Sequence, residues 1–190
     1  MAEIVLFHHA QGRTTGVLDF GTVLEEAGHR VHCPDLYDGV TFPNLEQGVR
    51  HAQEVGFDTI EERGRLYVED LLPTVVYAGF SLGVIPAQKL AMTRPGASGA
   101  LFFSAALPVA HFGAGWPTDL PLQVHMMQDD PWSIEDMPAA LELTASCERA
   151  TLYLYSGDRH LFLDISLDEY DAEAATLLQQ RVLEFLAAID

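Results

Sequence analysis

Short apolar runs alternate with longer amphipathic segments along the whole chain. Most of the runs are continuously apolar, as is typical of parallel strands buried on both faces, and they lie at residues 3–7, 29–33, 74–78, 99–103, 122–127 and 151–155. Helical periodicity predicts helices at residues 17–27, 45–72 in two pieces broken near Gly56, 82–92, 134–147 and 167–188. This order predicts an α/β fold in one domain, residues 1–190, with a mostly parallel sheet of about six strands and helices on both faces.

Charge and composition exclude several classes of partner. Acidic residues outnumber basic ones 28 to 10, for a formal net charge of −18, so nucleic acids and anionic membrane surfaces would be repelled. No apolar stretch approaches the roughly 20 residues that span a bilayer, and no basic segment precedes the first strand, so we expect a cytoplasmic protein without a membrane partner. The two cysteines, Cys33 and Cys147, provide no disulfide framework.

A Gly-x-Ser-x-Gly motif follows the third apolar run and precedes a helical segment. It reads Gly79-Phe80-Ser81-Leu82-Gly83. A serine hydroxyl is a weak nucleophile unless it is held exposed at a sharp turn, and glycines on both sides allow the backbone to approach its neighbours. An ordinary strand-to-helix turn is the alternative reading. The motif in this context favours a nucleophile elbow with Ser81 as the nucleophile.

An acid and a histidine follow two later strands, in the order serine, acid, histidine. Because the carboxyl ends of parallel strands meet at one edge of a sheet, these groups are expected there together. His160 would accept the Ser81 proton, and either Asp129 or Asp130 could orient its ring. Asp158 is closer to His160 in sequence and is expected to shape the turn.

A metal or other cofactor is not expected. His8 and His9, with Asp35 or His32, are conceivable ligands, but no pair of histidines or of histidine and acid sits on one helix face at ligand spacing. No glycine-rich phosphate loop is present either. The site is therefore expected to work with side chains and backbone amides alone.

The motifs together resemble those of the dienelactone hydrolase family of the α/β-hydrolase superfamily. The matching pieces are residues 8–12 (HHAQG), 34–37 (PDLY), 79–83 (GFSLG), 130–132 (DPW) and 155–162 (YSGDRHLF). The resemblance implies a compact α/β-hydrolase fold that lacks the superfamily's first hairpin. It selects Asp130 over Asp129 as the acid, and it adds Ala10 to Leu82 as the backbone donors of an oxyanion hole.

Two departures from the family's namesake enzymes bear on the substrate. The namesakes carry a cysteine nucleophile that interacts with a glutamate, whereas Ser81 and His9 stand at these positions here. They also use an arginine after the catalytic histidine to hold a substrate carboxylate, and Asp164 stands near that position. Neutral substrates are therefore expected in preference to dienelactone itself.

Residues in the loops at this edge are expected to line a pocket. The candidates for substrate contact are His9, Gln11, Tyr37, Trp132 and Phe162. The segment 106–121, rich in Gly, Pro and aromatic residues, is expected either to form a small lid or to pack the base of the loops.

The sequence thus predicts a serine hydrolase that cleaves a small carboxylic ester, lactone or thioester through an acyl-enzyme. One alternative is an acyltransferase or perhydrolase with the same three residues. Another is a catalytically silent α/β-hydrolase fold that serves as a binding module. The expected partner is a small-molecule ester or lactone; the apolar fraction of 48% is also compatible with a homodimer, although no segment marks an interface.

Overall fold

The computed structural model describes residues 1–189, so the last residue of the expected domain lies outside it. Its centre is one six-stranded sheet in the order β2-β1-β3-β4-β5-β6, with every neighbouring pair parallel. The strands are β1 (Glu3–Phe7), β2 (Arg30–His32), β3 (Val75–Phe80), β4 (Gly99–Phe103), β5 (Leu122–Met127) and β6 (Ala150–Tyr155). The predicted fold class, a mostly parallel sheet covered by helices, is confirmed.

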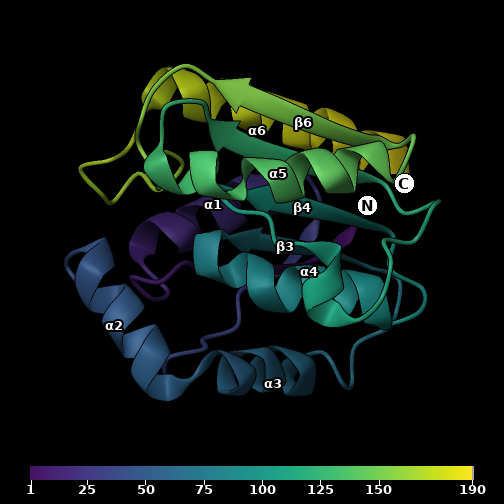
Figure 1. Ribbon diagram of the computed structural model, residues 1–190, viewed down its shortest axis with the longest axis horizontal. Coiled ribbons are helices and arrows are strands. Elements are labelled where there is room, and N and C mark those ends of the chain that lie inside the picture. Colours follow the sequence, from purple (N-terminus) through teal and green to yellow (C-terminus); the bar gives the residue numbers. More distant parts are fainter. Residues whose placement is uncertain (190) are drawn as a thin grey trace.

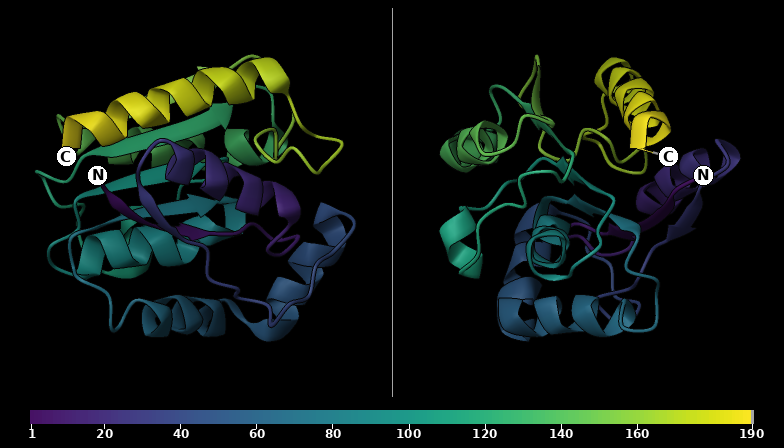
Figure 2. Two further views of the ribbon diagram at one scale, coloured as in Figure 1. Left: turned by 180° about the vertical axis from the view of Figure 1, so that it is seen from behind. Right: turned by 90° about the vertical axis from the view of Figure 1, so that its right-hand side faces the viewer.

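Helices cover both faces of this sheet. They are α1 (Thr15–Glu26), α2 (Leu45–Val55), α3 (Phe57–Tyr67), α4 (Val84–Thr93), α5 (Pro131–Ala145) and α6 (Ala172–Ile189), with short 3-10 turns η1 (Ser81–Gly83) and η2 (Val109–Phe112). Figure 1 shows α4 and α5 in front of the sheet with α3 below α4, and Figure 2 shows α1 and α6 on the opposite face. Among residues 1–189, no helix is both long and apolar enough to cross a membrane.

The apolar runs explain why the sheet is buried on both faces. Successive side chains of a strand point to opposite sides, so Val5 and Phe7 belong to the apolar cluster that includes residues of α3, α4 and α5, whereas Ile4 and Leu6 belong to the cluster that includes residues of α1 and α6. All four side chains are fully buried. Each such burial stabilises the fold by about 1.5–3 kcal/mol, which is why these runs carry almost no polar residue.

The last helix begins later than its apolar period predicts. Leu167 and Tyr170 fit the helical face, but residues 161–171 form a loop, and α6 starts at Ala172. Asp171 caps it, because its carboxylate accepts the backbone N–H groups of Glu173 and Ala174. The predicted break near Gly56 is confirmed: Gly56 has φ 88° and separates α2 from α3.

The strand order places a topological switch point at the carboxyl ends of β1 and β3. The chain passes from β1 to β2 on one side, and later strands are added beyond β3 on the other. Loops from these two neighbours therefore diverge, and such switch points are where open parallel sheets bind ligands. The Gly-x-Ser-x-Gly motif lies at the end of β3, at this switch point.

Candidate active site

Ser81 sits at the sharp turn between β3 and α4. Its φ of 47° lies in the left-handed region, which is uncommon for a residue with a side chain and indicates local strain. The flanking glycines make the turn possible: a β-carbon at Gly79 would lie 2.3 Å from the Gly83 carbonyl oxygen, and one at Gly83 would lie 2.3 Å from the Phe7 carbonyl oxygen. The strained turn places Ser81 at the carboxyl end of β3.

A chain of two hydrogen bonds links Ser81 to a buried carboxylate. Ser81 Oγ lies 2.7 Å from His160 Nε2, and His160 Nδ1 lies 2.7 Å from Asp130 Oδ2. An acidic partner at Nδ1 favours the tautomer with the proton on that nitrogen, which leaves Nε2 free to accept the hydroxyl proton. The imidazole is 6% exposed and the carboxylate 1% exposed, so the hydrogen bond between them is shielded from water.

Asp130 is held as a carboxylate by a set of donors. It accepts the backbone N–H groups of Trp132 and Ser133 and the Ser133 hydroxyl, and so also caps α5. Burial opposes its ionisation, but hydrogen bonds from His160, Ser133 and Trp132 outweigh it and lower the Asp130 pKa. Asp129, the alternative acid, is exposed and does not hydrogen bond to His160.

The two expected backbone donors lie where the turn meets the end of β1. Leu82 follows Ser81 directly, and Gly83 packs so closely that its β-carbon would lie 2.8 Å from the His8 carbonyl oxygen. Ala10, two residues further along that loop, is buried, and its N–H has no acceptor within residues 1–189. The close contact between Gly83 and the His8 carbonyl brings the loop that carries Ala10 against the turn that carries Ser81.

His9 does not face the pocket, contrary to the expectation from sequence. Its side chain is completely buried, and Nε2 lies 2.7 Å from Asp164 Oδ2. Asp164, expected near a substrate-binding arginine position, is likewise completely buried. These two residues hydrogen bond to each other inside the protein, and neither side chain is exposed in this structure.

Three other expected substrate contacts are also packed in the interior. Gln11 is 2% exposed and donates from Nε2 to the Phe42 carbonyl. Tyr37 is 2% exposed, its hydroxyl lacks a partner within the described residues, and burial raises its pKa. Phe162 is fully buried against Tyr155. All three side chains are therefore enclosed in the interior of this structure, and their contact with a substrate stays a prediction.

Trp132 is the exception and borders an open groove. It is 47% exposed, and its ring centroid lies 5.8 Å from that of His160. The groove, about 490 Å³, separates Trp132 from α2 and is lined by Leu45, Glu46, Val49, Arg50, Gln53 and Trp132. Gly48 of α2 packs on the loop of Ala10, since its β-carbon would lie 2.1 Å from the Ala10 carbonyl oxygen. One wall of the groove thus adjoins His160 and the other adjoins the Ala10 loop.

The segment 106–121 runs from this edge of the sheet to the opposite one. Its start is anchored by Gln88 of α4, which exchanges two hydrogen bonds with the Leu107 backbone. Trp116 is buried against Phe102 and donates from Nε1 to the Leu120 carbonyl. Most of the indole therefore packs the core.

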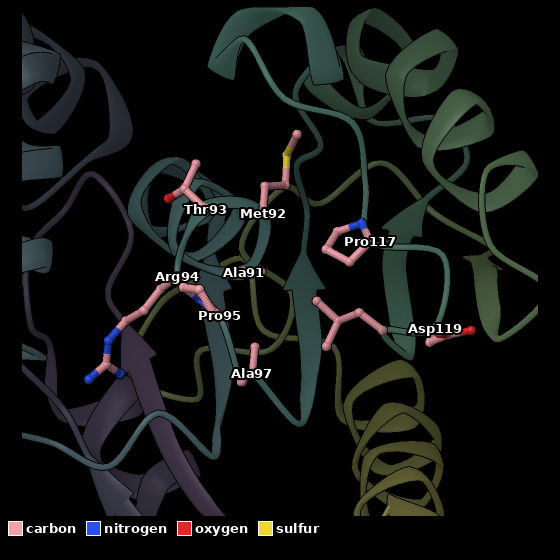
Figure 3. A pocket seen from close by; sticks show the side chains of 10 residues that line it. Ala91, Met92, Thr93, Arg94, Pro95, Ala97, Pro117 and Asp119 are labelled. Atoms are coloured by element: carbon pink, nitrogen blue, oxygen red, sulfur yellow. The ribbon is translucent and has the colours of Figure 1, made fainter.

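A second cavity lies where this segment reaches the beginnings of β4 and β5. It measures about 290 Å³ and is lined by residues 91–97 with Pro117, Asp119 and Leu120 (Figure 3). The Arg94 guanidinium beside it already donates to the Leu71 carbonyl and the Tyr77 hydroxyl. This cavity is at the end of the sheet away from Ser81.

Sequence reasoning missed the hydroxyl residues that hold the two buried carboxylates. Ser133 serves Asp130, whereas Thr14 and Ser166 donate to Asp164. The sequence signal for Ser133 was its place three residues after Asp130, where a helix-capping aspartate bonds the backbone. No comparable local signal exists for Thr14, which is 150 residues from Asp164.

The parallel sheet, the turn at Ser81 and the loops beyond the strand ends define an α/β-hydrolase fold. The family model of the dienelactone hydrolase family matches residues 1–189, and the chain belongs to that family. This membership supports a hydrolase. A search of curated protein sequences finds no match.

Solved structures share this fold at low sequence identity. A dienelactone hydrolase-like promiscuous phosphotriesterase, P91, from metagenomic libraries is 16% identical with a TM-score of 0.76, covering 100% of this chain and 87% of its own. The α/β hydrolase domain-containing protein 10 from mouse is 14% identical, with a TM-score of 0.73 and coverage of 99% and 90%. Esterase PE8 is 14% identical, with a TM-score of 0.69 and coverage of 100% and 93%.

Proposed function

We propose that the protein is a serine hydrolase that cleaves a small carboxylic ester, lactone or thioester through an acyl-enzyme. The observation that carries this proposal is the pair of 2.7 Å contacts from Ser81 Oγ to His160 Nε2 and from His160 Nδ1 to Asp130 Oδ2. The strained turn at Ser81 adds support, because strain of this kind persists where the surrounding structure holds a residue for function.

In the first half-reaction, Ser81 Oγ attacks the substrate carbonyl carbon and His160 Nε2 takes the hydroxyl proton. Asp130 stabilises the imidazolium that forms. The carbonyl oxygen becomes an oxyanion, which the N–H groups of Leu82 and Ala10 would stabilise. When the tetrahedral species collapses, the bond to the leaving oxygen or sulfur breaks, His160 returns its proton to that atom, and Ser81 carries the acyl group.

In the second half-reaction, water takes the place of the leaving group. His160 accepts a proton from the water as its oxygen attacks the acyl carbon, and the same N–H groups stabilise the second oxyanion. Collapse breaks the bond to Ser81 Oγ, which regains its proton from His160. The carboxylic acid product leaves, and the three side chains return to their starting state.

The surroundings of Ser81 favour a substrate without a charged group. The groove beside Trp132 is lined in part by the apolar side chains of Leu45 and Val49. Its one cation, Arg50, is exposed and pairs with Glu46 within the same helix. Arg13, another conceivable anchor for a carboxylate, is engaged by the Cys33 carbonyl and Asp35. With the net charge of −18, this favours neutral aryl or short alkyl esters over carboxylated lactones.

A fluorophosphonate probe separates this proposal from a silent binding module. We expect the unaltered protein to be labelled stoichiometrically at Ser81, and the Ser81→Ala variant to remain unlabelled although folded. Absence of labelling in the unaltered protein would overturn the proposal. Product analysis with added alcohols or hydrogen peroxide then distinguishes hydrolysis from acyl transfer and perhydrolysis, since only the accepting nucleophile differs.

The substrate class requires a second measurement. We expect kcat/KM for neutral aryl acetates to exceed that for a carboxylated lactone. A clear preference for the carboxylated lactone would show that a cation anchors the substrate, and the neutral assignment would be wrong.

A further inference from the structure

The carbonyl group of His9 is held from two directions. His8 Nδ1 lies 2.8 Å from the His9 carbonyl oxygen, and the Gly12 N–H donates to the same oxygen over 3.0 Å. The peptide between His9 and Ala10 is trans, so its N–H points opposite to its C=O. Holding the carbonyl on one side therefore fixes the Ala10 N–H on the other, and that N–H has no partner within residues 1–189.

The two histidine rings are themselves anchored to distant segments. His8 Nε2 accepts the Leu36 N–H over 2.9 Å, so Nδ1 carries the proton that reaches the His9 carbonyl. Burial lowers the pKa of His8 to about 4, which keeps the ring neutral in this tautomer. His9 Nδ1 accepts the Gln11 N–H, so its Nε2 donates to Asp164.

Asp164 joins two loops of the site. It accepts hydrogen bonds from His9 and Thr14 on the loop after β1, and from the backbone and hydroxyl of Ser166 on its own loop. Burial opposes its ionisation, but these donors prevail and lower the Asp164 pKa. Its own loop, which follows β6, also carries His160. Gly16 leaves room for the Asp164 carboxylate, because a β-carbon at Gly16 would lie 1.7 Å from Asp164 Oδ1.

We propose that His8, together with the His9–Asp164 pair, positions the peptide whose N–H stabilises the oxyanion. This inference rests on the proposed function. In that mechanism none of the three residues touches the substrate. They fix the direction of the Ala10 N–H and hold the loop of Ala10 at a set distance from the loop of His160. They would make the oxyanion site a rigid part of the fold that exists before the substrate arrives.

The kinetic test is Asp164→Asn, which keeps the side-chain volume and removes the negative charge to which His9 and Thr14 donate hydrogen bonds. Complete loss of one oxyanion donor lowers kcat by about 10²–10³-fold. We expect displacement of the Ala10 amide to lower kcat for an aryl acetate by about 10–100-fold, with KM changed by less than about twofold. The affinity for a trifluoromethyl ketone, which forms a tetrahedral adduct, should fall by the same factor as kcat/KM.

Asp171→Asn is the matched control. Asp171 lies in the same loop and caps α6, a role that asparagine also fills, and it makes no contact with His9. We expect this variant to keep kcat within about twofold. Equal losses of kcat in both variants would indicate general loosening of the loop and would overturn the positioning role.

A measurement independent of activity is hydrogen exchange of the Gln11 and Gly12 amides, which bond to His9. Asp164→Asn should speed their exchange at least about tenfold, whereas Asp171→Asn should leave it unchanged. Unchanged exchange in Asp164→Asn, or an unchanged kcat, would overturn the inference. If the unaltered protein neither cleaves esters nor reacts with fluorophosphonate, the proposed function fails, while exchange still decides whether Asp164 anchors the loop.

If Asp164→Asn does not fold, two substitutions of His8 decide the question. Asparagine places an amide donor near the position of Nδ1, and glutamine places an amide oxygen near that of Nε2. The inference requires His8→Asn to retain more activity than His8→Gln, because only the former keeps the donor to the His9 carbonyl. If His8→Gln retained more activity than His8→Asn, the role of His8 would be limited to accepting the Leu36 N–H, and the inference would be overturned.

Discussion

The backbone of Gly83 rests directly on the carbonyl of Phe7, the last residue of β1. A β-carbon at Gly83 would lie 2.3 Å from that oxygen, and backbone on both sides prevents relief by a side-chain movement. Gly83→Ala should therefore reduce the free energy of unfolding by about 3 kcal/mol, measured by urea denaturation. It should also abolish esterase activity, because the turn can no longer pack against the loop of Ala10.

Gly115→Ala is the control for that substitution. A β-carbon at Gly115 meets no atom within 4 Å. Its free energy of unfolding should stay within about 0.5 kcal/mol of the unaltered protein. A stability loss at Gly83 no larger than this would mean that the close packing of the turn is not required.

The choice of acid is tested by Asp130→Asn. Asparagine can still cap α5, so the fold should remain intact, but the ring of His160 loses its orienting charge. We expect kcat for an aryl acetate to fall by about 10³–10⁴-fold. The exposed neighbour provides the control, and Asp129→Asn should change kcat by less than about twofold. A larger loss at Asp129 would reverse the assignment.

The groove between α2 and Trp132 predicts a dependence on acyl length. Val49→Trp should fill much of it, and kcat/KM for an aryl octanoate should then fall about tenfold more than that for the acetate. Leu141→Trp, at a position that is 55% exposed on α5, should not alter the ratio. An octanoate-to-acetate ratio unaffected by Val49→Trp would place the acyl chain elsewhere.

Two buried neutral histidines predict acid sensitivity. Burial lowers the pKa of His125 to about 3 and that of His8 to about 4, from 6.5 in both cases. Below about pH 6.5 the unfolded chain takes up protons that the folded chain does not. The contribution of these histidines to the free energy of unfolding is therefore fully present above this pH and is lost as the pH falls below it. Each histidine should contribute a slope of about 1.4 kcal/mol per pH unit down to its folded pKa.

The variant His125→Gln tests this dependence away from the site. His125 is bonded to Tyr155 and Gln123 within the sheet, far along the chain from the loop of His8. Urea unfolding at pH 6.0 and 4.5 should show a slope reduced by about 1.4 kcal/mol per pH unit relative to the unaltered protein. An unchanged slope would mean that His125 is not kept neutral by burial.

The sequence predicted the sheet and the edge at which Ser81, Asp130 and His160 meet. These positions were accessible because each follows an apolar run, and the carboxyl ends of parallel strands share one edge. The directions of the loop side chains were not accessible. His9 follows a strand at the same edge, but its ring turns inward toward Asp164, 155 residues away, and no local pattern encodes such a partner.

The start of α6 was missed for a different reason. Leu167 and Tyr170 continue the apolar period of the helix, so periodicity alone extends it toward the N-terminus. The cap at Asp171 ends that extension, and its signal is a single acidic residue followed by good helix formers. The resulting loop, residues 161–171, is what allows Asp164 to reach His9.

The hydrogen bond between His9 and Asp164 joins residues that are 155 positions apart in the sequence, so the site depends on both ends of the chain. β6, which precedes the loop of Asp164, lies at one edge of the sheet and pairs with β5 alone. The turn at Ser81 comes before this strand in the chain, whereas His160 and Asp164 both come after it. Catalytic competence would therefore require the docking of the C-terminal segment, so recovered activity during refolding would report that docking and not the formation of the rest of the sheet.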